Sequence, residues 1–289
     1  MINADIAAAL ADGVLLGLIY ALLGLGLGIV LGLMGVVNMA HGAFVMLGSF
    51  LAYELSRRFG IDPVTSLFLA LPLFFAVGCL VYRALVSRVA QGSGLLAMFG
   101  LMVLLESLGT ILWTNDSRVL AGPHSDSSIT LGGIALAQVR LLAGGVALIL
   151  IGSVWAFLRF TLTGRAVRAV GQDRAAATAL GIDASRLAAT TFGLGIACAG
   201  AAGTVLAMVF PFSPNTQVQW LPWAFLVAIL GGLGNIANLL AAGLAIGLLQ
   251  TLCTAVLPFD YVYLALYLLL AATLILRRQG LGGAIRRAS

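Results

Sequence analysis

Long apolar runs alternate with short polar connections over the whole chain. A helix needs about 20 mostly apolar residues to cross a bilayer, so the pattern predicts an all-α polytopic membrane protein with about eight to ten transmembrane helices. Glycines interrupt the first two runs, and a broken or re-entrant helix is expected near 24–42. The candidate spans are 11–33, 38–56, 63–82, 95–113, 140–158, 187–210, 219–236, 237–257 and 260–276.

The composition excludes several other classes of protein. Of the 289 residues, 62% are hydrophobic and 9% are charged, against about 25% charged in a soluble domain. No segment is polar enough to form a soluble catalytic domain. All 15 basic residues are arginines, and a chain without lysine has no phosphate-loop lysine and no Schiff-base amine. If ATP drives this protein, another chain must hydrolyse it.

The arginines lie in the polar connections, which predicts an orientation. Cytoplasmic loops carry the excess of positive charge. With 159–186 inside, nine alternating spans place eleven arginines inside, put the C-terminus inside and put the N-terminus outside. The four arginines left outside are Arg57, Arg58, Arg118 and Arg140. This grouping is typical of a membrane protein and not of a nucleic-acid-binding surface.

Small residues predict close helix packing. Gly24, Gly28 and Gly32 recur every four residues and share one helix face, which favours close approach of another helix. The three cysteines lie singly inside apolar runs and are interpreted as packing residues. With two histidines and no paired acids in one span, we expect no metal site and no catalytic residue.

One pattern, G-x-x-N-x-A-[HN], occurs twice, at Gly35–His41 and at Gly232–Asn238. Both copies are predicted at a cytoplasmic connection that leads into an outward-going span. Transporters are often built from repeats. An internal repeat and a chance match in low-complexity sequence both fit this observation.

The longest predicted cytoplasmic connection, 159–186, contains a candidate docking helix. Residues 165–180 are rich in alanine, arginine and leucine, and Gly181 is a typical helix stop. Asp183 is placed to cap the next span. Arg165 and Arg168 share one face. That face fits either a basic loop at anionic lipid headgroups or a docking site for a cytosolic partner.

Four motifs in order resemble the permease subunits of branched-chain amino acid ABC importers, of the H type rather than the longer M type. They are Val37–Ser49, Gly164–Asp183, Leu230–Asn235 and Arg277–Gly282, and the similarity covers about 13–283. The resemblance implies one permease domain over 1–289 with a coupling helix within 159–186 and a cytoplasmic tail at 277–289. It assigns coupling to Gly164, Arg165, Arg168, Asp173, Arg174 and Gly181.

The resemblance also implies partners. They are a second homologous permease subunit, two ABC ATPase subunits that hold ATP and magnesium, and an extracytoplasmic solute-binding protein, in a bacterial inner membrane. No cofactor is expected on this chain. The implied substrates are branched-chain or other hydrophobic amino acids, although relatives of this kind also serve amides, urea and aromatic acids. Glu106 and Asn235 depart from the family pattern, which bears on the substrate more than on the fold.

Five polar residues are candidates for the substrate path or gate: Asn38, His41, Glu106, Asn235 and Asn238. An intramembrane acid such as Glu106 either lines the transport path or gate, or it snorkels or is paired at a subunit interface. Asn38 and His41 are equally interpreted as groups that satisfy backbone atoms at a broken helix. His124 is expected on a surface turn, and that loop and 212–217 are expected landing places for the binding protein.

Two other classes of function fit the residues less well. A secondary transporter needs intramembrane ion ligands or a proton relay, and the chain offers chiefly Glu106 and His41 for this. An integral-membrane enzyme needs a metal site or an acid–base pair, which the sequence lacks. An ATP-driven importer permease therefore fits best, with a secondary transporter as the alternative.

Overall fold

The computed structural model describes residues 2–89, 93–120, 127–131, 134–232 and 235–256, together with 261, 264–265, 267–269 and 271–272. The predicted span 260–276 lies largely outside these residues, and His124 and the tail 277–289 lie wholly outside them. The helices are α1 (Ile2–Met34), α2 (His41–Phe59), α3 (Pro63–Ala84), the short 3₁₀ helix η1 (Val86–Arg88), α4 (Gly94–Trp113), α5 (Gln138–Phe160), α6 (Leu162–Gln172), α7 (Arg174–Ala179), α8 (Ala184–Val209), α9 (Thr216–Gly231) and α10 (Ile236–Val256).

The prediction of an all-α polytopic membrane protein is confirmed. Within the described part of the chain, six helices are long and apolar enough to cross a membrane, namely α1, α3, α4, α5, α8 and α10. The apolar helix α9 has 16 residues, or about 24 Å, and is shorter than the bilayer core of about 30 Å. The predicted span 219–236 corresponds to α9, which runs from Thr216 to Gly231 and so lies three to five residues earlier in the chain.

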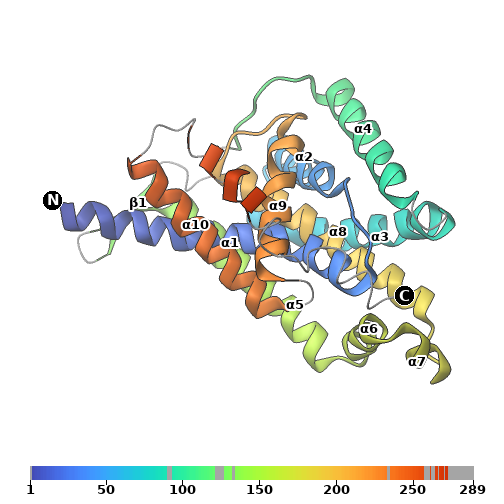
Figure 1. Ribbon diagram of the computed structural model, residues 1–289. Helices are drawn as coiled ribbons and strands as arrows, with labels where there is room; N and C mark the ends of the chain where they lie inside the picture. The colour runs from blue at the N-terminus through green and yellow to red at the C-terminus, as the bar shows by residue number, and fades with distance from the viewer. Residues whose placement is uncertain are drawn as a thin grey trace.

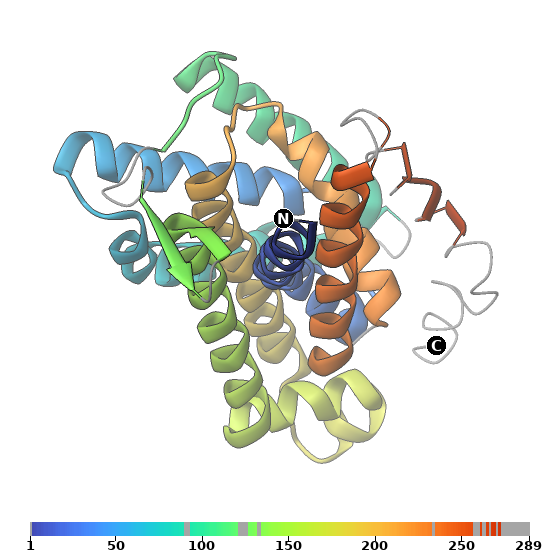
Figure 2. The same ribbon diagram turned by 90° about the vertical axis from the view of Figure 1, so that its left-hand side faces the viewer.

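α1 is the central helix, and Figure 2 looks along it from its N-terminal end, with α5, α8 and α10 around it. Its apolar stretch is 83% buried. Glycines on several of its faces permit this packing: a Cβ at Gly17 would lie 2.6 Å from the Cα of Leu244 on α10. Gly24 rests on Val227 of α9, and Gly28 lies against Leu239 of α10. These close approaches replace the hydrophobic driving force that lipid does not supply between helices.

α8 forms the second layer of the core and is also 83% buried in its apolar stretch. α2 and α3 pack on it. Ser49 Oγ on α2 donates to Gly203 O on α8 at 2.8 Å, and Thr204 Oγ1 on α8 donates back to Gly48 O at 3.3 Å. By contrast, α4 is only 11% buried and lies at the edge of the bundle (Figure 1). Many of its apolar side chains are exposed, among them Leu96, Ile111 and Leu112.

The arginines separate between the two ends of the bundle, as predicted. We call the end formed by the C-terminus of α3, η1, α6, α7 and the start of α8 the basic end. Cys79 Sγ donates to Ala189 O there, joining α3 to α8. The described arginines of the basic end are Arg83, Arg88, Arg159, Arg165, Arg168, Arg174 and Arg186. At the opposite end, Arg118 pairs through its backbone with Phe212, and Arg140 pairs with Asp12.

The connection 114–139 is more ordered than the loop expected there. It contains a two-stranded antiparallel hairpin, β1 (Ser128–Leu131) and β2 (Ile134–Ala137), with Ser128 opposite Ala137. Branched residues at 129, 130 and 134 favour this extended pairing. The hairpin lies against α1 and leads directly into α5.

Candidate functional site

The predicted coupling segment contains two helices and not one. The single helix expected at 165–180 is corrected to α6 and α7, which are separated at Asp173. Asp173 has an extended backbone, φ −151° and ψ 102°, and its Oδ1 accepts from Ala176 N at 2.9 Å. An aspartate side chain competes with the helix for backbone N–H groups, so it ends one helix and caps the next.

The other two local predictions for this segment are confirmed. Gly181 adopts φ +82°, the left-handed conformation that ends α7. Asp183 Oδ1 accepts from the backbone N–H groups of Ser185 and Arg186, at 3.1 and 3.0 Å, and caps α8. The coupling segment therefore ends at Gly181, which terminates α7, and at Asp183, which caps α8.

One face of α6 anchors the segment to the bundle. Gly164 is buried directly against the backbone of α5 at Phe157 and Leu158, and Val167 is buried. A Cβ at Gly171 would lie 2.7 Å from the side chain of Leu33, near the end of α1. α6 is thus in direct contact with both α1 and α5.

The other face of α6 is open. Arg165 and Arg168 are both exposed. Two apolar side chains of α6 and of the end of α7 are also exposed: Leu162 is 78% exposed and Leu180 is 83% exposed. Figure 1 shows α6 and α7 together at the edge of the molecule, below α8. Cationic and apolar groups on one protruding surface suit a protein partner. Arg174 begins α7.

A re-entrant segment follows α1. His41 Nε2 donates to the carbonyl of Leu23 at 3.0 Å, yet α1 continues eleven residues further, to Met34. Eleven helical residues span about 16 Å, so residues 35–40 return along the end of α1 before α2 begins. Gly35, with φ +66°, makes the turn. This places the break at the end of the region 24–42 where the sequence predicted one.

Asn38 has no partner within this segment. It is 0% exposed, and neither its Oδ1 nor its Nδ2 has a hydrogen-bond partner among the described residues. The interpretation that Asn38 and His41 satisfy backbone atoms at a broken helix is wrong for Asn38. His41 does bond a backbone carbonyl, but that carbonyl lies inside α1 and not at the break. Nδ1 of His41 is likewise unpaired within the described part of the chain. Leaving a buried polar group unpaired costs about 1–3 kcal/mol.

Glu106 has a partner inside the chain. Gln217 Nε2 on α9 donates to Glu106 Oε2 on α4 at 2.6 Å, and Gln217 is 1% exposed. The backbone of Gln217 touches Gly42, next to His41. Gln217 thus joins the intramembrane acid to the start of α2. In the segment 212–217, expected as a landing place for the binding protein, Phe212, Thr216 and Gln217 are buried and Asn215 is exposed, so docking there stays a prediction. The polar residues of 212–217 suggested an exposed loop, but most of this segment packs into the helix bundle.

Asn235 and Asn238 do not join this buried group. Asn235 is exposed and Asn238 lies at the same open start of α10, where Asn235 Oδ1 accepts from Ala237 N at 3.0 Å to cap the helix. Within the part of the chain that the structure describes, no three histidine, cysteine or acidic residues are placed to hold a metal ion.

Known proteins resemble this chain over nearly all of its length. A family described as "Branched-chain amino acid transport system / permease component" matches residues 9–285. The high-affinity branched-chain amino acid transport system permease protein LivH of Escherichia coli is 30% identical, covering 94% of both chains. Protein BraD of Pseudomonas aeruginosa, another high-affinity branched-chain amino acid transport system permease, is 28% identical over 95% of this chain and 94% of its own. Permease protein LivM of Salmonella typhimurium is 29% identical over 79% of this chain and 60% of its own. No solved structure matches.

Proposed function

The chain belongs to the permease-component family of branched-chain amino acid transport systems, and from this membership we propose that it is a transmembrane subunit of an ATP-driven importer. The substrates are branched-chain amino acids, the class named in the descriptions of its relatives, or other hydrophobic amino acids. ATP and magnesium belong on separate ATPase subunits, in keeping with a chain that has no lysine.

The structural feature that supports this proposal is the surface of α6 and α7. It presents Arg165 and Arg168 outward, while Gly164 and Val167 fix the same helix to the bundle. An ATPase that docks on the outer face moves α6, and α6 moves α1 and α5. Alternating access around a shared path results from such rocking of packed helices.

The basic end lies in the cytoplasm in this proposal, as the distribution of arginine favours. The opposite end then receives the solute-binding protein. The exposed apolar faces of α3 and α4, where Phe68 is 83% and Ile111 77% exposed, contact lipid or the second permease subunit. The segment 35–41 and the Glu106–Gln217 pair border the transport path. Asn235 and Asn238, at the start of α10, lie only at the cytoplasmic entrance of this transport path.

The test is reconstitution of the complex that copurifies with this chain, with uptake of radiolabelled leucine driven by ATP inside proteoliposomes. Changing Arg165 and Arg168 together to glutamate is expected to lower uptake about tenfold or more, because charge reversal at an interface costs several kcal/mol. The complex should still assemble in the membrane.

The matched control changes Arg83 and Arg88 to glutamate, which alters the charge of the same end by the same amount away from α6. This control should retain most of the uptake. Equal losses in both variants, or normal coupling in the first, would remove the coupling role of α6. Leucine uptake by the chain alone, without any ATPase, would establish the secondary transporter instead.

A further inference from the structure

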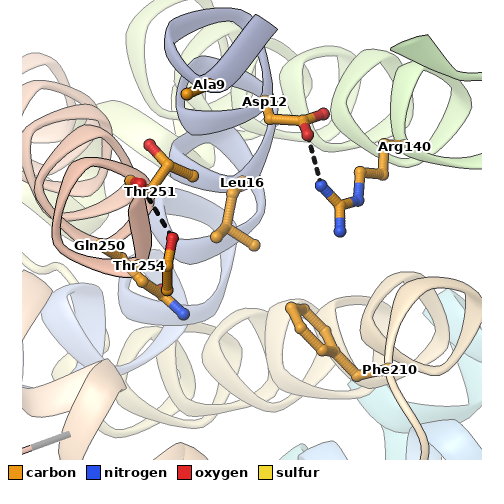
Figure 3. A pocket seen from close by; sticks show the side chains of 8 residues that line it. All are labelled: Ala9, Asp12, Leu16, Arg140, Phe210, Gln250, Thr251 and Thr254. Carbon is orange, nitrogen blue, oxygen red and sulfur yellow. Dashed lines mark hydrogen bonds and ion pairs between the residues drawn. The ribbon is translucent and has the colours of Figure 1, made fainter. Parts of the chain in front are cut away.

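A cavity of about 300 Å³ lies at the end of the molecule opposite the basic end. It lies between α1, α5, α10 and Phe210 at the end of α8, and it is partly open to the outside (Figure 3). Its volume is at the lower limit for small-molecule sites. Apart from the Asp12–Arg140 pair, none of the residues assigned above to coupling or to the transport path lines it.

The mouth of the cavity holds a pair of opposite charges. Arg140 Nη1 on α5 lies 2.6 Å from Asp12 Oδ2 on α1, and their side chains are 43% and 29% exposed. Neither side chain makes another hydrogen bond to the described residues, so Asp12 Oδ1 keeps acceptor capacity and the rest of the guanidinium keeps donors. The ion pair therefore offers both a cation site and an anion site.

Deeper in the cavity, uncharged polar groups of α10 form part of the wall. Gln250 is buried, and its Oε1 accepts from Tyr20 Oη at 2.6 Å. Its amide nitrogen points away from α10 toward the side of Phe210 (Figure 3). The hydroxyl of Thr254 donates to the Thr251 carbonyl at 2.8 Å, so the hydroxyl oxygen remains an acceptor. Leu16 and Phe210 supply an apolar wall.

We infer that this cavity binds the zwitterionic head of an amino acid with an apolar side chain. Arg140 and the amide nitrogen of Gln250 receive the carboxylate, and Asp12 with Thr254 receives the ammonium. The apolar side chain lies on Leu16 and Phe210. This inference rests on the proposed function and adds to it a site on this chain where the solute enters.

The balance of charge selects this class of solute. A zwitterion satisfies both members of the Asp12–Arg140 pair and leaves the site neutral, whereas a lone carboxylate or a lone amine satisfies one member only. A purely structural clamp between α1 and α5 requires neither the cavity nor the inward amide of Gln250. Partial exposure screens the charges and keeps binding weak, as a site that must release its solute into a pathway requires.

The experiment measures binding of radiolabelled leucine to the purified complex without the solute-binding protein. We expect leucine to bind, and 4-methylpentanoate and 3-methylbutylamine, which each carry one of the two charges, to compete at least about tenfold more weakly. Asp12→Asn and Arg140→Gln should each weaken leucine binding about tenfold or more. Gln250→Glu keeps the acceptor for Tyr20 but repels the carboxylate, and should have a similar effect.

Two controls separate binding from folding. The double change Asp12→Arg with Arg140→Asp restores an ion pair with the opposite polarity. It should recover thermal stability but not leucine binding, since the apolar wall then faces the wrong side of the solute. Arg58→Gln removes a member of the Glu54–Arg58 pair at the same end of the molecule, outside the cavity, and should leave binding unchanged.

Failure of this inference is distinguishable from failure of the proposed function. No leucine binding by the wild-type complex, unchanged binding in the cavity variants, or equal competition by the single-charge analogues would overturn the site while ATP-driven uptake persists. Loss of the proposed function itself would appear as a complex without an ATPase or without ATP-dependent uptake.

Discussion

Residues Gly35–His41 and Gly232–Asn238 carry the same glycine, asparagine and alanine at the same spacing. Both begin with a glycine in the left-handed region, at φ +66° and +77°, directly after a helix. Beyond that point they differ. Asn235 is exposed and caps α10, whereas Asn38 is fully buried, has no partner among the described residues, and precedes a helix without a side-chain cap.

In both copies the glycine of the shared motif follows directly after the end of a helix. The path of the chain after that glycine depends on the tertiary contacts of each copy. In the second copy the chain begins α10 within four residues of Gly232, so asparagine performs its usual capping role. In the first copy the chain re-enters the bundle, and His41 is held by α1 instead. Asn38 is left where water cannot reach it. Within the membrane, non-helical backbone is found only where it is buried in protein or where it lines a water-filled cavity.

The greatest loss of stability is expected where the first copy packs on α1. A Cβ at Gly26 would lie 2.5 Å from Gly195 O and 3.0 Å from the His41 ring, while one at Gly28 would meet only the flexible end of Leu239. Gly26→Val should therefore destabilise the protein by about 3 kcal/mol or more, and Gly28→Ala by under about 1 kcal/mol. Thermal unfolding in detergent checks this. Similar losses would show that both copies are packed alike.

A smaller difference is expected at the last residue of each copy. His41→Leu removes the bond to the Leu23 carbonyl and leaves that carbonyl without its side-chain donor inside the bundle, so a loss of about 1–3 kcal/mol is expected. Asn238→Leu changes a residue at the open start of α10 and should alter the free energy of unfolding by no more than about 0.5 kcal/mol. Chemical denaturation of the purified chain gives both values. A tolerated His41→Leu would mean that the re-entrant segment is held by other contacts.

The two asparagines should give the weakest effects, and these have opposite signs. Asn235→Ala removes a helix cap and should cost about 1 kcal/mol. Asn38→Leu removes an unpaired buried amide and should leave stability unchanged or raise it by up to about 1 kcal/mol. Leucine uptake should nonetheless fall in Asn38→Leu if its amide meets the solute or pairs in another state of the cycle. Loss of stability in Asn38→Leu would show that the amide has a partner in the folded protein.

Much of the fold was predictable, because hydrophobic run length is a strong signal in a membrane protein. The spans 63–82, 95–113 and 140–158 agree with α3, α4 and α5 to within a few residues. Capping by Asp183 and the stop at Gly181 were predictable for a related reason, since these residues act on neighbours a few positions away. The split at Asp173 was missed because alanine and arginine on both sides favour a continuous helix.

The candidate site was less predictable. Glu106 was recognisable as an acid inside an apolar run, but its partner Gln217 stands 111 positions away and resembled a surface loop. Arg140 was assigned only to the outer side, and nothing in the spacing of Asp12 and Arg140 indicated that they meet across a cavity.

Membrane location, helical class, the grouping of arginines and the exposed segment between α5 and α8 were all fixed by the order of residues along the chain. Each of these depends on composition or on neighbours within a few positions. Tertiary packing was needed to make Gly35–His41 re-enter while Asn235 and Asn238 stay exposed, and to bring Asp12, Arg140 and Gln250 to one cavity. Such outcomes depend on which helices contact each other. In lipid these contacts are determined by close packing of small residues that are far apart in the sequence, and the hydrophobic pattern of the sequence does not indicate them.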